Sequence, residues 1–307
     1  MATIPKIRPI EPVPNSSLIY ADTSIWNCLN DQQVNGQNLL GSLAAHDKRF
    51  VLGENVLSEM AKTFQVSNPR SVDRAAKLFS CVKSFLDSGV LVLKPTWALL
   101  IEEALHVMKQ GPEVMAFAPA TDHLCQIVDK FSKGDFDSPA LQLVRERRGE
   151  AQQTRAVAIA HLKARPKLTS ILRQVSSANL PGWIARQAMS ARGRAVLGGH
   201  LQVQFPSNEP KELSYTAKKL LASRRYRVSH ALVRSDLYVN WRCANHGSLR
   251  SDVPDDIFHV VNASYCDLFI TTDRDQAGYV VHALNRSKVL LYGKTEPLSK
   301  WLLEETF

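Results

Sequence analysis

The sequence has few of the features that mark secreted, fibrous or membrane-spanning proteins. Its 307 residues contain five cysteines, and none forms a CxxC pair, which excludes a disulfide framework and gives no support to a structural zinc site. No run approaches about 18 uninterrupted apolar residues, so no spanning helix is expected. The first residues, MATIPKIRPIEPVPNSS, contain four prolines and no apolar core, unlike a signal or transit peptide. We therefore expect a cytoplasmic protein with reduced thiols and a flexible lead over residues 1–14.

The composition is otherwise that of a globular protein. Apolar residues make up 45% of the chain and charged residues 22%, close to the average for folded domains. This balance excludes a fully disordered chain, a collagen-like chain and a coiled-coil rod. A chain of 307 residues has room for one large α/β domain, or for a smaller domain that carries a long insertion.

Basic residues are concentrated in the middle of the chain. Residues 145–250 contain 20 of the 38 Lys and Arg but only 5 of the 29 Asp and Glu, a local net charge of +15, whereas the remainder carries −6. This asymmetry indicates a polyanionic partner, most commonly nucleic acid, because Lys and Arg that neutralise phosphates release condensed counterions. A solvated basic helix face is the alternative interpretation. No membrane partner is expected, because these cations are not paired with one strongly apolar helix face.

The densest basic runs are the candidate nucleic-acid contacts. They contain Arg145, Arg147, Arg148, Arg224, Arg225 and Arg227. Tyr226 and Trp241, close to the second run in sequence, are candidates to stack a base beside a bound backbone. An exposed helix face explains the same runs without a ligand.

Strand-like and helix-like segments alternate at both ends of the chain. Short apolar segments typical of buried strands lie at 17–21, 49–53, 90–93, 268–271 and 289–292. Between residues 111 and 249 the pattern is helical, and only 201–205 alternates as a strand would. This organisation predicts an α/β domain with a central parallel sheet, formed by residues 15–110 and 250–307 and interrupted by a helical, basic insertion over residues 111–249.

Four carboxylates lie where such a sheet would bring them together. Asp22 and Asp273 each follow a strand, and Glu59 and Asp256 lie early in helices next to those strands. Because ligands of an open parallel sheet gather at the carboxyl ends of its strands, these acids are expected at one edge, where they would repel each other unless cations were bound. This arrangement is typical of a Mg²⁺ or Mn²⁺ site for phosphoryl transfer. Taken singly, each acid is better explained as a helix cap, a first-turn charge or a solvated residue.

Three segments resemble the signature blocks of PIN-domain nucleases, the fold of toxin endoribonucleases and of several RNA-processing enzymes. They are YADTSIW, ENVLSEMAK and DDIFHVVNASYCDLFITTDRD. In that family a strand delivers an Asp followed by Thr-Ser, and a helix then supplies a Glu. A later helix begins with an Asp that has an Ala seven positions on, and the next strand ends Thr-x-Asp. Here Ala263 stands seven positions after Asp256, and Thr271-Thr272-Asp273 ends its strand.

The resemblance covers about residues 15–110 and 250–307 and has no counterpart for residues 111–249. It implies a three-layer α/β/α fold, Mg²⁺ or Mn²⁺ as cofactor, and hydrolysis of phosphodiester bonds, usually in RNA. The implied catalytic residues and metal ligands are Asp22, Glu59, Asp256 and Asp273. The implied supporting residues around these carboxylates are Thr23, Ser24, Thr272 and Asp275.

These features predict a metal-dependent nuclease, most simply an endoribonuclease whose basic insertion grips nucleic acid, RNA rather than DNA. The alternative is a catalytically inactive PIN-like module that binds nucleic acid or protein. A Rossmann-type nucleotide enzyme is disfavoured because no GxGxxG or GxxxxGK[ST] follows any expected strand. An inhibitory protein partner and a homodimer both stay open.

The register of the helix near residue 256 decides which of two adjacent acids faces the site, because adjacent helix residues point about 100° apart. Residues four and seven positions further on define one stripe for each acid. The stripes contain Val260 and Ala263 for Asp256, and His259 and Asn262 for Asp255. We therefore expect Asp256 on the sheet-facing side, and His259 and Asn262 on a polar stripe that faces solvent.

Overall fold

A computed structural model describes residues 16–62, 69–118, 120–135, 166–246, 253–284, 289–293 and 296–304. The predicted N-terminal lead over residues 1–14 and the basic run with Arg145, Arg147 and Arg148 lie outside these residues. The side chain of Asp255 is also outside the description.

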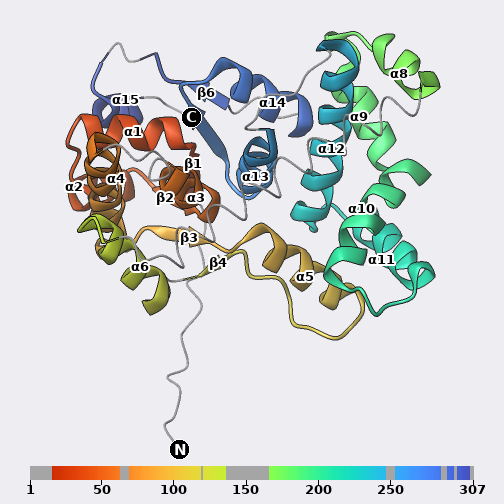
Figure 1. Cartoon of the computed structure of the whole chain (residues 1–307), viewed down its shortest axis with the longest axis horizontal. Helices are drawn as coiled ribbons and strands as arrows, with labels where there is room; N and C mark the ends of the chain where they lie inside the picture. Colours follow the sequence, from red (N-terminus) through yellow and green to blue (C-terminus); the bar gives the residue numbers. More distant parts are fainter. Residues whose placement is uncertain are drawn as a thin grey trace, which may run out of the picture.

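The described residues form an α/β fold around one mostly parallel sheet, which confirms the prediction of an α/β domain with a central, mostly parallel sheet (Figure 1). The strands follow the order β4-β3-β2-β1-β5-β6, and every neighbouring pair is parallel except β3 with β4. Their bounds are β1 Ser17–Ala21, β2 Lys48–Gly53, β3 Leu91–Leu93, β4 Phe117–Ala118, β5 Leu268–Thr271 and β6 Val289–Leu291.

The central strand β1 reads SLIYA, and residues 18–21 are all buried. A near-continuous apolar run is expected for a parallel strand that is covered on both faces. In the register of the sheet, Tyr20 lies opposite Val51 of β2 and Phe269 of β5. The last residues of β1 and β5 therefore finish side by side, and the residues that follow them share one edge of the sheet.

One set of helices packs around the first half of the sheet. Trp26 of α1 meets Phe50 and Phe85 edge to face, with ring centroids 5.4 and 5.0 Å apart, and Phe79 meets Phe131 at 5.0 Å. These aromatic contacts join helices and sheet into one core. The helices are α1 Thr23–Asp31, α2 Gly36–Ala44, α4 Pro69–Asp87, α6 Asp122–Ser132 and α15 Leu298–Glu304.

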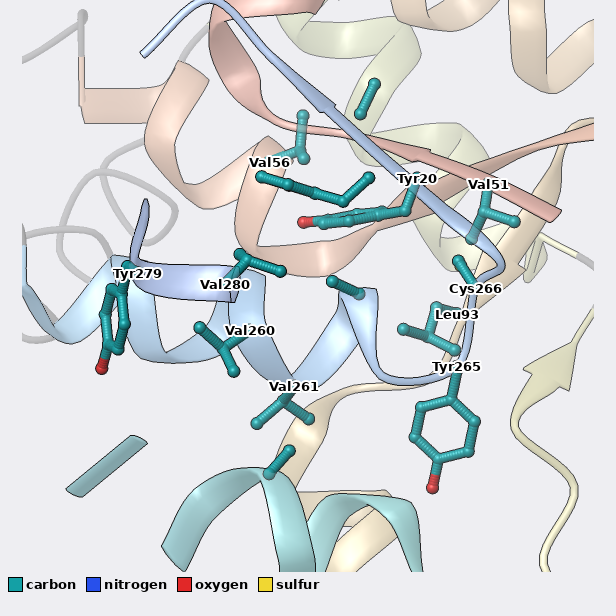
Figure 2. Packing of buried hydrophobic residues seen from close by; sticks show 14 of the residues in the cluster. Tyr20, Val51, Val56, Leu93, Val260, Val261, Tyr265, Cys266, Tyr279 and Val280 are labelled. Carbon is teal, nitrogen blue, oxygen red and sulfur yellow. The ribbon is translucent and has the colours of Figure 1, made fainter. Parts of the chain in front are cut away.

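A second set of helices lies near the predicted carboxylates. It consists of α3 Glu54–Lys62, α5 Thr96–Val107, α13 Val253–Ala263 and α14 Arg274–Leu284. Glu59 belongs to α3, Asp256 to α13, and Asp273 precedes α14. Helix α13 packs against α3, α5, α12 and α14. Figure 2 shows Val260 and Val261 of α13 among the buried side chains, on the side of this helix away from the Tyr20 ring.

The described part of residues 111–249 is mostly helical. Its described elements besides β4 and α6 are α8 Pro166–Arg173, the 3₁₀ turn η2 Ser177–Asn179, α9 Leu180–Ala188, α10 Ala191–Gln204, α11 Pro210–Ala222 and α12 Arg227–His246. The long helix α12 packs against α5, α13 and α14 and so joins the insertion to the sheet (Figure 1).

A buried carboxylate fixes the start of α12. Glu103 of α5 accepts hydrogen bonds from the amides of Val228 and Ser229 at 3.0 and 2.9 Å, from the Ser229 hydroxyl at 2.6 Å, and from Tyr265 at 3.1 Å. Amides at a helix N-terminus lack intrahelical partners, so a carboxylate there satisfies them. Burial raises the pKa of Glu103, and these hydrogen bonds only partly offset the effect.

Two expectations for the insertion are wrong in detail. Strand β4 pairs with β3 although it lies beyond residue 110, so the sheet extends into the predicted insertion. Residues 201–204 end helix α10 instead of forming a strand. Leu201 is buried while Val203 is 74% exposed, because positions two apart on a helix point about 200° apart. The same alternation of exposure would arise on a strand.

Candidate functional site

Asp22 lies at the carboxyl end of β1 and is almost completely buried. It caps helix α1: its Oδ1 accepts from the amide of Ile25 at 3.1 Å and from the Ser24 hydroxyl at 2.6 Å. Its Oδ2 accepts from the hydroxyl of Thr271, the last residue of β5. Burial raises the pKa of Asp22, although His259 and these hydrogen bonds favour the ionised form. The cap that the sequence offers as an alternative role is therefore present together with a contact to the neighbouring strand.

Glu59 of α3 reaches the same edge. Its Oε2 accepts from the hydroxyl of Thr23, the residue after Asp22, and its Oε1 lies 3.1 Å from His259 Nε2. Glu59 thus connects α3, α1 and α13. Thr23 and Ser24, both predicted to support the carboxylates, each donate a hydroxyl to one of them.

Asp273 follows β5 and is exposed. Its Oδ1 accepts from the amides of Asp275 and Gln276 at 2.7 and 3.3 Å, which makes it the cap of α14. Its own amide donates to Thr271 Oγ1 at 2.9 Å. Thr271 therefore bridges Asp22 and Asp273, the two acids predicted at the ends of neighbouring strands.

Thr272 contributes through its backbone rather than its side chain. Its amide donates to the Ser24 hydroxyl at 2.9 Å, so Ser24 connects the start of α1 to the end of β5.

Asp256 is half-buried on α13. Its charge is one of several that raise the pKa of His259, and it also acts on Arg242 of α12. Burial lowers the pKa of Arg242, but Tyr238, Asp275 and Asp256 outweigh burial and raise it. Arg242 Nη2 lies 3.4 Å from Asp275 Oδ2. The insertion therefore places a cation among the acids of this edge.

Behind the carboxylates lies a buried polar cluster that sequence reasoning did not find. Its members are Tyr20, Asn55, His259 and Asn262. Tyr20 donates to Asn55 Oδ1 at 3.0 Å, and its oxygen lies 2.7 Å from His259 Nδ1. Asn262 donates to Tyr20 at 3.2 Å and also to Asn55. Figure 2 shows the Tyr20 ring among apolar side chains, including Val56.

This cluster overturns the expected solvent-facing stripe on α13. His259 and Asn262 are each only 3% exposed, and Val260 and Ala263 are buried as well. His259 and Asn262 contact Tyr20 of β1 and Asn55 of α3, so the stripe expected to face solvent lies against the sheet and the predicted register of α13 is wrong. Asn55, in the first turn of α3, also belongs to the cluster.

The charge of His259 follows from its neighbours. Burial lowers the pKa of His259, but the charge and hydrogen bond of Glu59, with Asp22 and Asp256, outweigh burial and raise it to about 9. The amide nitrogen of Asn55 lies 2.8 Å from Nδ1, which suits a neutral ring that accepts there. The carboxylates of Glu59, Asp22 and Asp256 favour the protonated ring. The protonated ring then donates from Nδ1 to Tyr20 and from Nε2 to Glu59.

The carboxylates do not yet form a metal centre in this conformation. Among the described residues, no three His, Cys, Asp or Glu side chains are arranged to hold a metal ion. Asp22 is tied to Thr271 and Ser24, and Glu59 to Thr23 and His259, so the site consists of neighbouring carboxylates held by hydrogen bonds.

Among the described residues, the arginines of the second basic run form their hydrogen bonds with residues other than these acids. Arg224, Arg225 and Arg227 are exposed, and Arg225 donates to the Tyr226 hydroxyl at 2.5 Å and lies 3.0 Å from His106 Nε2. Tyr226 and Trp241 are only 5% and 8% exposed. The expectation that these two rings stack a base is therefore wrong for this conformation, because a stacking platform needs an open ring face.

Within the described segments of the chain, no helix is both long and apolar enough to cross a membrane. Comparisons of the chain with protein-family models, with curated proteins and with solved structures found no match.

Proposed function

We propose that this protein is a metal-dependent nuclease with a PIN-like, three-layer α/β/α domain, and that it hydrolyses phosphodiester bonds in RNA. The observation that carries the proposal is the bridge from Asp22 through Thr271 to Asp273. It places the Asp22 carboxylate next to the backbone of Asp273 at the carboxyl edge of the parallel sheet, where ligands of such sheets bind. Glu59 reaches the same edge through Thr23.

The donor atoms at this edge suit a hard cation. Mg²⁺ and Mn²⁺ prefer carboxylate oxygens, and the proposed ligands are Asp22, Glu59, Asp256 and Asp273. Both oxygens of Asp22 and of Glu59 accept hydrogen bonds from the protein. An ion would therefore bind only as these side chains exchange some of those hydrogen bonds for it.

The chain's own residues supply orientation and charge. Ser24 and Thr271 hold Asp22 from two sides, and Thr23 and His259 hold Glu59. Carboxylates fixed before the substrate arrives need less rearrangement during the reaction. A divalent ion, when bound, supplies positive charge against the phosphate and polarises water. Arg242 offers a guanidinium to phosphate oxygens once it leaves Asp275.

An inactive PIN-like module that binds nucleic acid or protein is the second candidate. The observation that favours it is the hydrogen-bond saturation of Asp22 and Glu59, together with the lack of three converging ligands among the described residues. In such a module the basic insertion would bind a partner, and the carboxylates would serve as helix caps and structural acceptors.

The test is incubation of the purified full chain with labelled single- and double-stranded RNA and DNA, in Mg²⁺, Mn²⁺ or EDTA. We expect cleavage of RNA with a divalent ion, and none in EDTA. Asp22→Asn should reduce the rate by about a hundredfold or more. The matched control is Asp31→Asn, an exposed acid at the far end of the same helix.

The outcomes separate the two candidates. Full activity of Asp22→Asn combined with Asp273→Asn would remove this edge as the catalytic site. RNA binding without cleavage under every metal condition would favour the inactive module.

A further inference from the structure

A second site lies at the opposite ends of the helices that start at the acidic edge. A pocket of about 660 Å³ is lined by residues of α9, α12 and the ends of α13 and α14, including Ser264 and Leu284. Figure 1 shows α9, α12 and α14 side by side. At a rise of 1.5 Å per residue, Ser264 lies about 12 Å from Asp256 along the axis of α13. Leu284 lies about 16 Å from Asp273 along the axis of α14. The pocket is therefore separate from the carboxylates.

Three arginines give the pocket a strongly positive lining. They are Arg224, Arg227 and Arg234, and none of the described lining residues is acidic. Arg224 is exposed and makes no hydrogen bond or ion pair with any described residue. The pocket thus holds cations without a matching anion from the described part of the chain.

Helix capping explains only part of this arrangement. Arg227 Nη1 donates to the carbonyl of Ser264 at 3.2 Å, and Arg234 Nη1 donates to the carbonyl of Leu284 at 3.2 Å, as basic residues often do at helix C-termini. The Nε of Arg234 is buried and has no hydrogen-bond partner among the described residues. A buried donor without a partner is costly, and an anion in the pocket would supply one.

The positive charges of the pocket favour binding of an anion. Burial lowers the pKa of Arg234, and the charge of Arg224 lowers it further. Burial likewise lowers the pKa of His230, with Arg234 and Arg224 adding to the effect. Arg224 and Arg234 repel one another in the free protein, and a bound phosphate would relieve that repulsion through charge-assisted hydrogen bonds.

The other side of the pocket is apolar. It includes Leu221, Ala222 and Met189, and Met189 is 52% exposed. Methionine adapts its shape to flat or irregular ligands. We propose that this pocket binds a nucleotide. The arginines would hold its phosphate group, and the apolar side of the pocket would pack against the planar face of its base.

Two sources offer this chemistry, a free nucleotide or a nucleotide of a bound strand. Arg227, Arg234 and Arg242 lie on one face of α12, because spacings of 7 and 15 residues return to within about 60° of the same direction. Arg242 lies at the acidic edge. A strand with one phosphate in the pocket would pass this row toward the carboxylates; this second source rests on the proposed nuclease function.

Calorimetric titration of the full chain in EDTA tests the site without any cleavage. The probes are adenosine monophosphate, adenosine, and a short single-stranded RNA. We expect Arg224→Ala to weaken binding of a phosphate-bearing probe by about tenfold or more, the loss of a charge-assisted contact. Lys218→Ala is the matched control, because Lys218 is an exposed cation of α11 that does not line the pocket.

Each outcome decides the proposal. Binding of adenosine monophosphate that depends on Arg224 supports the site with a free nucleotide as its source, and binding of RNA alone that depends on Arg224 supports it with a strand phosphate. The proposal is overturned if neither phosphate-bearing probe binds, if adenosine binds as tightly as its monophosphate, or if the two variants lose binding equally. Since no metal is present, these results do not depend on whether the protein cleaves RNA.

Discussion

Gly53 ends β2 and lies against the buried polar cluster, where a larger residue has no room. A Cβ at this position would come within 2.8 Å of Asn55 Oδ1 and closer still to Asn262 Nδ2. Gly53→Ala should therefore push apart hydrogen-bonded groups in the core, and we expect it to lower the free energy of unfolding by about 1–3 kcal/mol in urea denaturation.

Gly41→Ala is the control for that substitution. Gly41 lies within α2, and a Cβ there would meet nothing within 4 Å. Alanine is the better helix former, so this variant should be neutral or more stable by up to about 1 kcal/mol. Equal destabilisation of both variants would mean that the cluster does not enclose Gly53.

At the scale of single residues, the sequence predicts acids better than it predicts their neutral partners. Asp22 stands out because it follows a strand and precedes Thr-Ser. His259 and Asn262 have no comparable signal, because a polar stripe beside an apolar one normally marks a solvent-facing side. Their burial depends on Tyr20 of β1 and Asn55 of α3, which come from a distant part of the chain. Only Gly53, a glycine at a strand end, carries a local sign of close packing.

At the scale of elements, the contact between α5 and α12 depends on one carboxylate. Glu103 accepts from two amides and two hydroxyls. In Glu103→Gln an NH₂ group replaces one acceptor oxygen, so at least one buried donor loses its partner. We expect a loss of about 1–3 kcal/mol in the free energy of unfolding at neutral pH, even though burial raises the pKa of the native Glu103.

The adjacent Glu102 provides the control for Glu103. It pairs with Lys94 at 2.6 Å and is 33% exposed, so Glu102→Gln should cost less than about 1 kcal/mol. If the two variants were equally stable, the start of α12 would not be fixed by Glu103.

A second contact between elements, His200 of α10 with Asp236 of α12, predicts a pH dependence. His200 Nε2 lies 2.7 Å from Asp236 Oδ2. Burial lowers the pKa of His200, but the hydrogen bond and charge of Asp236 outweigh burial and raise it. A raised pKa means that the protonated form stabilises the folded state. This contribution is complete below the unfolded pKa of about 6.5 and is lost as pH rises through the folded pKa.

Urea denaturation at several pH values above and below about 6.5 measures this effect. The wild-type chain should lose a few tenths to about 1 kcal/mol as pH rises, because the pair is partly exposed. Asp236→Asn should flatten that part of the profile. A profile that stays as steep in Asp236→Asn would assign the pH dependence to other groups.

Elements with strong local signals are those that the sequence predicts correctly. Strands β1 and β5 are apolar runs with a following acid, and both have the expected bounds. Helix α2 was not expected, because Asn35-Gly36 resembles a break; Asn35 instead caps this helix by accepting from the Asn38 amide at 3.0 Å. Strand β4 has two residues, too few for a period of two to be visible.

At the scale of the whole molecule, the uneven charge has consequences that no single contact shows. The basic central segment carries +15 and the rest of the chain −6, and α12 joins the two parts. A polyanion would therefore be attracted to the insertion and repelled by the acidic edge until cations neutralise it. Binding of nucleic acid should consequently be separable from the requirement for a metal ion.

Salt dependence of RNA binding measures how much of the basic insertion contacts phosphates. In EDTA, the logarithm of the association constant should fall linearly with the logarithm of salt concentration, by about 0.7 for each phosphate neutralised on a single strand. Replacement of Arg224, Arg225 and Arg227 by Gln should flatten this slope by up to about 2. The matched control replaces Lys77, Lys83 and Lys133, which are exposed but already paired with Asp73, Asp87 and Asp129; these cations are neutralised within the protein, so the slope should not change. A slope that is unaltered by the arginine replacements would show that this run is a solvated helix face, and the charge asymmetry would then need a different partner.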